Sequence, residues 1–323
     1  RLGAPRTSIS DPTTFTFREN FDQYRPGQLA RYFSDVNGAF EVAPARGGRD
    51  GMCYRQVVSA RPVSWIDPKM PPVTLVGDPQ WWGDYNASVD VLLEDGGYTE
   101  LLTRVIAQRG LHLDGYHLRI AGDGTWRLYS ETLSDTGHTL LEGRIPVGTG
   151  IWHRIGLHMR ADSLGVWIDR RLVGSIRDSA HLTGQIGLLV SPWNHAEFDN
   201  LEIASSAPAP YFIPSSEIHV SATSSYQGLY HGYDYLAANA SDDRPETFWH
   251  SNWAPRMALP QSLTLDMGKV LPTQGLLYLT RMDGSTKGNI TAYNVYISTD
   301  DVHYQKISQG TWSASDGQKM LRW

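Results

Sequence analysis

The chain has 323 residues, of which 41% are hydrophobic and 19% charged, a composition that excludes a disordered protein and a length that predicts two domains. The formal net charge is −6, and Lys and Arg form no run that would neutralise a phosphate backbone, so nucleic acid is not an expected partner. A single cysteine, Cys53, rules out an internal disulfide.

No apolar run approaches the roughly 18 residues that a membrane helix needs, so no transmembrane segment is expected. The opening "RLGAPRTSIS" has no initiator methionine and lacks the apolar core of a signal peptide. We therefore expect a processed or excised piece of a secreted, extracellular protein.

Short alternating stretches recur along the chain, separated by Gly, Asp and Asn turns: "YNASVDVLLE", "GYHLRIAGDGTWRLYSE", "WHRIGLHMRADSLGVWIDRRLVGSI" and "QSLTLDMGKV". Period-two alternation predicts β-strands, with hairpins at "GDG" and "DRR". The fold class predicted is all-β, with two jelly-roll β-sandwiches. The small residues and prolines of "IASSAPAPYFIPSS" predict a linker over 205–214, between domains at 1–204 and 215–323.

The first domain contains "FRENFDQY", "YRQVVSARPVSWI" and "HAEFDNLEI". On these stretches it resembles the C-terminal lectin domain of glycoside hydrolase family 59, the galactocerebrosidase type. The resemblance implies a jelly roll that accompanies a catalytic TIM barrel and a smaller β-sandwich, neither of which is found in this sequence. It also implies that a tryptophan at the position of Trp65 lines the sugar site of that barrel.

In the same family a calcium ion joins the first strand to the last. Carried over by position, its ligands would be Asn20, Asp22, Asp199 and the backbone carbonyl of Met52. Carboxylate, amide and carbonyl oxygens are the ligands that calcium accepts. The alternative for Asp199 is a turn-capping role beside Asn200.

The segment "EFDNLE" supports a rival interpretation, because it nearly matches the E-x-D-x-x-E arrangement of jelly-roll glucanases. Under this interpretation the first domain is itself a glycosidase, with Glu197 and Glu202 as its two carboxylates on one face of a bulged strand. Asn200 stands where that arrangement has an apolar residue.

The second domain contains "AANASDDRPETFWHSNW", "LPQSLTLDMGKV", "GLLYLTRMDGSTKGNITAYNVYISTDD" and "GTW". On these it resembles the discoidin or coagulation factor 5/8 type C domains, including carbohydrate-binding module family 32. The resemblance implies that His250 and Arg281 bind the hydroxyls of a terminal galactose-type sugar, with Trp249 and Trp253 buried around the histidine loop. Lys287 replaces the family's usual asparagine, and Asn289 lies just beyond it.

Such modules hold a structural calcium below the binding loops, and the turn "NASDDRPET" offers Asp242 and Thr247 as ligands. The sequence ends at "KMLRW", before the strand that completes this fold in the family. The function predicted is therefore carbohydrate binding by the non-catalytic part of a galactosidase-like glycoside hydrolase. Glycosidase action through Glu197 and a free-standing lectin or adhesin are the alternatives.

Overall fold

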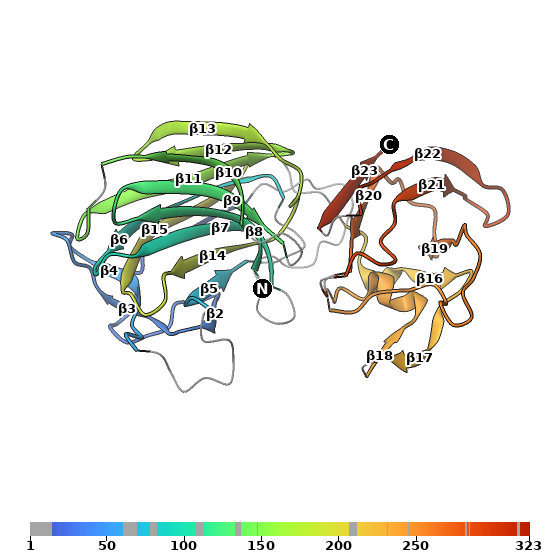
Figure 1. Ribbon diagram of the computed structural model, residues 1–323, viewed down its shortest axis with the longest axis horizontal. Coiled ribbons are helices and arrows are strands. Elements are labelled where there is room, and N and C mark those ends of the chain that lie inside the picture. Colours follow the sequence, from blue (N-terminus) through green and yellow to red (C-terminus); the bar gives the residue numbers. More distant parts are fainter. Residues whose placement is uncertain are drawn as a thin grey trace. The chain divides into compact units, whose positions relative to one another are not determined.

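Fifteen strands in the first part of the chain form two antiparallel sheets that face each other (Figure 1). The computed structural model describes residues 15–323 except for 61–69, 78–82, 108–112, 133–136, 147, 207–211, 231, 245, 282, 284 and 315–316. The described residues divide into two units, the first up to residue 206 and the second from Phe212 onward. Each unit is described by itself.

The eight-stranded sheet of unit 1 has seven strands in the order β13 (Arg171–Arg177), β12 (Ser163–Ile168), β11 (Trp152–Arg160), β6 (Tyr85–Leu93), β15 (Ala196–Ser205), β4 (Met52–Gln56) and β3 (Phe40–Pro44). Its eighth strand, β1 (Thr16–Glu19), pairs with β15. The second sheet has the order β10 (His138–Arg144), β9 (Thr125–Glu131), β8 (Leu113–Ala121), β7 (Tyr98–Ala107), β14 (Gln185–Val190), β5 (Val73–Val76) and β2 (Phe33–Asn37). Unit 1 is thus a β-sandwich.

The core of unit 1 lies between the two sheets, and strand alternation explains which residues fill it. In β12, Leu164, Val166 and Ile168 are at most 2% exposed, whereas the residues between them point away from the core. In β15 the register shifts between Asp199 and Glu202, where Asn200 has a φ of 48°. This bulge keeps the apolar residues on both sides of it facing inward.

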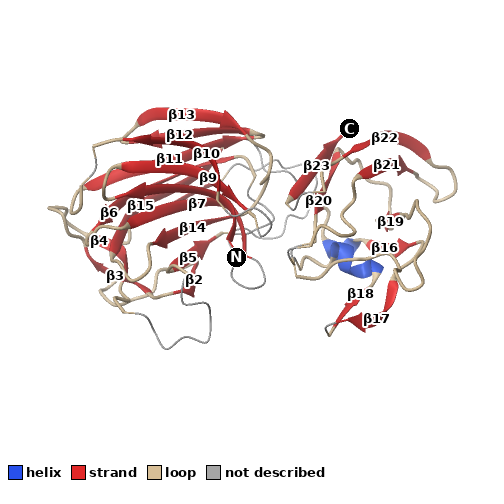
Figure 2. Ribbon diagram, viewed as in Figure 1, coloured by secondary structure: helices blue, strands red, loops and turns tan. Residues whose placement is uncertain are grey.

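Unit 2 consists of two-stranded antiparallel ladders joined by long loops (Figure 2). The pairs are β16 (His219–Ala222) with β19 (Leu263–Asp266), β17 (Tyr226–Tyr230) with β18 (Tyr233–Tyr235), β20 (Gly275–Leu279) with β23 (Gln318–Arg322), and β21 (Ala292–Ile297) with β22 (Gln305–Thr311). Two short 3-10 helices, η1 (Ser215–Glu217) and η2 (Ala237–Ser241), complete it. Both units are β-sandwich domains, as the sequence predicts.

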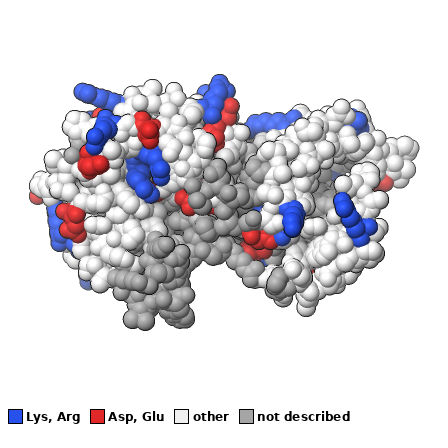
Figure 3. Space-filling model, in the orientation of Figure 1, with Lys and Arg blue, Asp and Glu red and all other residues white. Residues whose placement is uncertain are grey.

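On the face shown in Figure 3, Lys and Arg side chains are scattered among uncharged residues, and some of them stand beside Asp or Glu. The last strand of unit 1 ends at Ser205, and η1, the first element of unit 2, begins at Ser215.

Within the described part of the chain, no helix has the length and apolar character needed to cross a membrane.

Candidate functional site

The loop between η2 and β19 positions His250 through aromatic contacts. Trp253 stacks on Tyr226 with ring centroids 3.7 Å apart, and its ring meets the edge of His250 at 4.7 Å. Trp249 donates its indole N–H to the carbonyl of Ser224 at 3.0 Å. Both tryptophans are half-buried rather than buried. They nevertheless restrict the loop, because each ring has a fixed partner outside it.

Arg281 follows β20 and is held in one orientation. Its Nε donates to Asp283 Oδ1 at 2.7 Å, its Nη2 donates to the other oxygen of Asp283, and its Nη1 donates to the carbonyl of Lys287 at 2.8 Å. The guanidinium lies 4.6 Å from the ring centroid of Phe248. Arginine has five N–H donors, so two remain for a ligand. Phe248 was not predicted, although it stands two residues before His250 in the sequence.

A glycine brings these two side chains to one place. Gly288 has a φ of +88°, and a Cβ built there would lie 2.6 Å from His250 Nε2. The residue before it, Lys287, accepts the hydrogen bond from Arg281. His250 Nδ1 lies 2.7 Å from the carbonyl oxygen of Ser251, so Nδ1 carries a proton, and in the neutral ring Nε2 is an acceptor. The site therefore combines guanidinium donors with one imidazole acceptor.

Lys287 and Asn289 have different positions relative to this site. Lys287 is exposed and contributes its carbonyl to Arg281. Asn289 donates its side-chain amide to the carbonyl of Ala314 at 3.0 Å, which fixes the loop after β22. Among the described polar contacts, none joins the Asn289 side chain to His250 or Arg281.

The turn after η2 brings together the two residues expected to bind calcium in unit 2. The Thr247 hydroxyl lies 2.6 Å from Asp242 Oδ2 and 3.0 Å from the carbonyl oxygen of Arg244. Asp242 Oδ1 accepts the backbone N–H of Arg244 at 3.0 Å. Carboxylate, hydroxyl and carbonyl oxygens thus converge in one turn, and these are suitable ligands for calcium.

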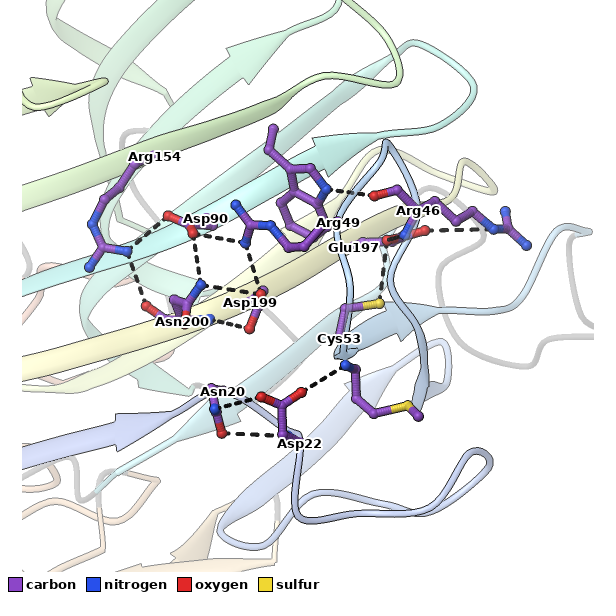
Figure 4. Close-up of polar contacts among 12 residues, drawn as sticks. Asn20, Asp22, Arg46, Arg49, Cys53, Asp90, Arg154, Glu197, Asp199 and Asn200 are labelled. Atoms are coloured by element: carbon purple, nitrogen blue, oxygen red, sulfur yellow. Dashed lines mark hydrogen bonds and ion pairs between the residues drawn. The ribbon is translucent and has the colours of Figure 1, made fainter.

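In unit 1, three of the four expected calcium ligands lie together (Figure 4). Asn20 donates its amide to Asp22 Oδ2 at 2.8 Å, and the backbone N–H of Met52 donates to Asp22 Oδ1 at 2.9 Å. Gly51 approaches so closely that a Cβ on it would stand 2.6 Å from Asp22 Oδ1. Asn20 and Asp22 fit calcium in chemistry and position, whereas Met52 contributes its N–H here.

Asp199 belongs to a separate set of contacts on β15. Arg49 Nη1 lies 2.8 Å from both Asp199 Oδ2 and Asp90 Oδ2, and Arg154 Nη1 lies 2.8 Å from Asp90 Oδ1. Burial raises the pKa of Asp199, and the Arg49 guanidinium works in the opposite direction. The Arg49 guanidinium thus compensates the Asp199 carboxylate from the side of Asp90. Asp199 fits calcium in chemistry, but its charge is already compensated.

Glu197 and Glu202 lie on the face of β15 that points away from the core, and both are held in polar contacts. Glu197 is 0% exposed and accepts the Arg46 backbone N–H at 2.9 Å and the Cys53 thiol at 3.4 Å. Burial raises its pKa, and neighbouring Glu94 adds to the effect. Glu202 pairs with Arg18 at 2.8 Å. A buried carboxylate without access to substrate is a poor nucleophile, so the geometry disfavours the glycosidase alternative.

Trp65 lies outside the described residues, as do all residues from 61 to 69. In the described part of the chain, no group of three or more His, Cys, Asp or Glu side chains forms a metal site.

Comparison with known proteins gives matches to both units. Residues 35–206 match the family described as "Galactocerebrosidase, C-terminal lectin domain", and residues 219–321 match the F5/8 type C domain. The A type blood N-acetyl-alpha-D-galactosamine deacetylase of Flavonifractor plautii is 34% identical over 118 residues, covering 36% of this chain and 15% of that protein. Galactocerebrosidase of Danio rerio is 28% identical over 214 residues, covering 62% of this chain and 31% of that protein.

Among solved structures, CpGH89CBM32-5 from Clostridium perfringens, in complex with GalNAc-β-1,3-galactose, is 34% identical. The matched region covers 34% of this chain and 77% of the chain in that structure, and the TM-score is 0.32. The chain spans less than a third of the length of the two curated relatives.

Proposed function

This chain belongs to the family of galactocerebrosidase C-terminal lectin domains, and from that premise we propose that it recognises terminal galactose or N-acetylgalactosamine. Both units are related to carbohydrate-binding domains. The observation that carries the proposal is the convergence of His250 and Arg281 at Gly288 in unit 2. A galactose-type sugar suits this site, because its hydroxyls need directional donors and acceptors.

The two groups have complementary roles in the proposed complex. Arg281 donates its two remaining N–H groups to sugar oxygens, and Nε2 of the neutral His250 ring accepts a hydrogen bond from one sugar hydroxyl. The aromatic cluster formed by Tyr226, Tyr235 and Trp253 fixes the histidine loop before the ligand arrives. Few contacts are available to a single sugar, so we expect a dissociation constant of about 0.1 to 1 mM, or roughly −4 to −5.5 kcal/mol.

Binding of the full chain to galactose and to N-acetylgalactosamine by isothermal titration calorimetry tests this proposal. His250→Ala and Arg281→Ala should each weaken binding at least tenfold, since each removes a hydrogen-bonding partner of the sugar. His219→Ala, at an exposed position on β16, is the matched control and should bind as the parent does. Unchanged binding by both site variants would refute the assignment.

We further propose that the chain is the non-catalytic part of a secreted galactosidase-like hydrolase, placing substrate for a catalytic TIM barrel. The support is the match of residues 35–206 and the relatedness to galactocerebrosidase. The longer gene product should hydrolyse galactosides while this chain alone should not. If the gene encodes no barrel, the free-standing lectin or adhesin replaces this proposal.

Structural calcium is also part of the proposal. In unit 1, Asn20, Asp22 and the Met52 carbonyl would hold the ion, and Asp199 would join them by exchanging Arg49 for the metal. In unit 2, Asp242, Thr247 and the Arg244 carbonyl would hold a second ion. Calcium would supply no chemistry at the sugar, but it would stabilise the folded state, and in unit 1 it would also tie segments distant in sequence.

A further inference from the structure

A groove lies on the outer face of the seven-stranded sheet of unit 1, over β8, β9 and β10. This open groove has a volume of ≈ 430 Å³, and its lining includes three arginines, Arg119, Arg127 and Arg144, with Glu142 and Thr125. Leu118 and Leu128, the neighbours of Arg119 and Arg127, belong to the core. Because side chains alternate along a strand, the two arginines point away from the core and into the groove.

Register places Arg119 directly opposite Arg127 on adjacent strands. Like charges in this arrangement are destabilising unless an anion compensates them. Both guanidiniums flank one ring, that of Tyr129, at 5.4 Å and 4.3 Å from its centroid. Both guanidiniums therefore lie beside the same ring, and both line the groove.

Arg119 is fixed in place before any ligand binds. Its Nε lies 2.6 Å from Oε1 of Glu100, which is 0% exposed, and its guanidinium lies 3.7 Å from the ring centroid of Tyr98. The Tyr129 hydroxyl also donates to Glu100, at 2.8 Å and 2.9 Å from its two oxygens. This arrangement gives Arg119 a single orientation, which lowers the entropic cost of binding.

The positive charge of Arg127 is less well compensated than that of Arg119. Its Nη1 lies 3.5 Å from the Thr139 hydroxyl, and among the described residues it forms no ion pair with a carboxylate. Glu142 is opposite it on β10, exposed at the edge of the sheet. Arg144, the third cation, lies 3.6 Å from Asp123.

We propose that this groove binds an acidic sugar, whose carboxylate or sulfate group bridges the guanidiniums of Arg119 and Arg127. Arg144 and Thr125 contact the sugar's hydroxyls. Two guanidiniums suit such an oxyanion because each offers paired N–H donors in a plane. This site is in unit 1 and is independent of the galactose site proposed in unit 2. Glu142 opposes the ligand's charge and limits its affinity.

Calorimetric titration of the full chain with galacturonate, galactose 6-sulfate, inorganic sulfate and galactose tests the inference. Arg127→Gln should weaken binding of the two acidic sugars about tenfold or more, as expected for loss of a charged hydrogen bond. Glu142→Gln should strengthen it, since it removes the repelling carboxylate. Arg171→Gln, at an exposed position on β13 of the other sheet, is the matched control.

The variants also separate this site from the one in unit 2. His250→Ala should leave the binding that depends on Arg127 unchanged, whereas Arg127→Gln should leave galactose binding unchanged. Inorganic sulfate binding as tightly as galactose 6-sulfate would reduce the groove to a simple anion site and overturn the proposal. Acidic-sugar binding that Arg127→Gln does not alter would also overturn it.

Discussion

Gly288 lies against the imidazole of His250, so closely that a Cβ at this position would stand 2.6 Å from Nε2 and 3.2 Å from Cδ2. Its φ of +88° falls in the left-handed region that favours glycine. Gly288 is therefore required for two reasons: a Cβ would collide with His250, and the backbone has a positive φ. This residue also lies between the contacts of His250 and Arg281.

Gly288→Ala should weaken galactose binding by about tenfold or more, because the new methyl group must displace His250 or its own loop. The backbone cost of alanine at positive φ is about 1 kcal/mol. Gly268→Ala provides the control, since Gly268 has a φ of +65° and a Cβ added there would have no atom within 4 Å. Calorimetry should show reduced affinity for the first variant alone, with similar losses of stability in both.

Asp283→Asn tests whether the orientation of Arg281 matters for binding. Burial raises the pKa of Asp283, but the Arg281 guanidinium outweighs it and holds that pKa below the ordinary 3.8. Asp283 is therefore ionised from pH 4 upward. The variant loses this charge pairing and should bind galactose several-fold more weakly than the parent, but better than Arg281→Ala. Asp300→Asn, at another exposed acid of unit 2, should bind normally; equal loss in both would contradict the assigned role.

The sequence predicts the two sandwiches well, because the alternation of apolar residues within a single strand identifies the face that is buried. Leu164, Val166 and Ile168 alternate with small or outward-facing residues, and the pattern needs no knowledge of the partner strand. The register between strands is not local information. The placement of Arg119 opposite Arg127, and hence the groove, depends on how β8 and β9 pair, which no short motif specifies.

The same distinction applies to the candidate sites. Asp242 and Thr247 stand in one turn, so their convergence follows from sequence spacing. Asp199 is 150 positions from Arg49, and only the folded sheet reveals that a guanidinium compensates its charge. Asn289, expected at the sugar, donates its side-chain amide to the carbonyl of Ala314, a contact that its position in the sequence does not indicate.

Calcium should raise the unfolding temperature of unit 1, since an ion bound only by the folded state stabilises it by about 2.7 kcal/mol at 100 times the dissociation constant. Arg49→Gln should increase calcium affinity, because it frees the carboxylate of Asp199 for the metal. Arg25→Gln, at an exposed position in the same region, is the control. A chelator that leaves melting unchanged, with no calcium found by elemental analysis, would refute the unit 1 site.

Glu197→Gln should not abolish any hydrolysis, because this chain is expected to hydrolyse no galactoside. Its effect should instead be on stability. Burial raises the folded-state pKa of Glu197 above its ordinary 4.5, so the ionised form costs stability as pH rises through that range. The variant should therefore be at least as stable as the parent at pH 7, and the advantage should vanish near pH 4. Hydrolytic activity in the parent that the variant lacks would restore the glycosidase alternative.

The buried pair formed by His117 and Glu100 should give unit 1 a stability optimum in mildly acidic solution. Burial lowers the pKa of His117, but the Glu100 carboxylate, 2.7 Å from Nδ1, outweighs it and raises that pKa above the ordinary 6.5. Burial likewise raises the pKa of Glu100, but the hydrogen bond from His117 and the charge of Arg119 bring it below the ordinary 4.5.

Each shift has a definite sign in the pH dependence of unfolding. The contribution of His117 is complete below pH 6.5 and is lost as pH rises through its higher folded-state pKa, whereas that of Glu100 is complete above pH 4.5 and is lost as pH falls through its lower one. Urea unfolding of the full chain between pH 4 and 9 should therefore show the unit 1 transition weakening at the alkaline end. His117→Gln should remove that alkaline loss, while His138→Gln, at an exposed position on β10, should keep it. An alkaline loss that persists unchanged in His117→Gln would show that the pair does not hold the charge its geometry implies.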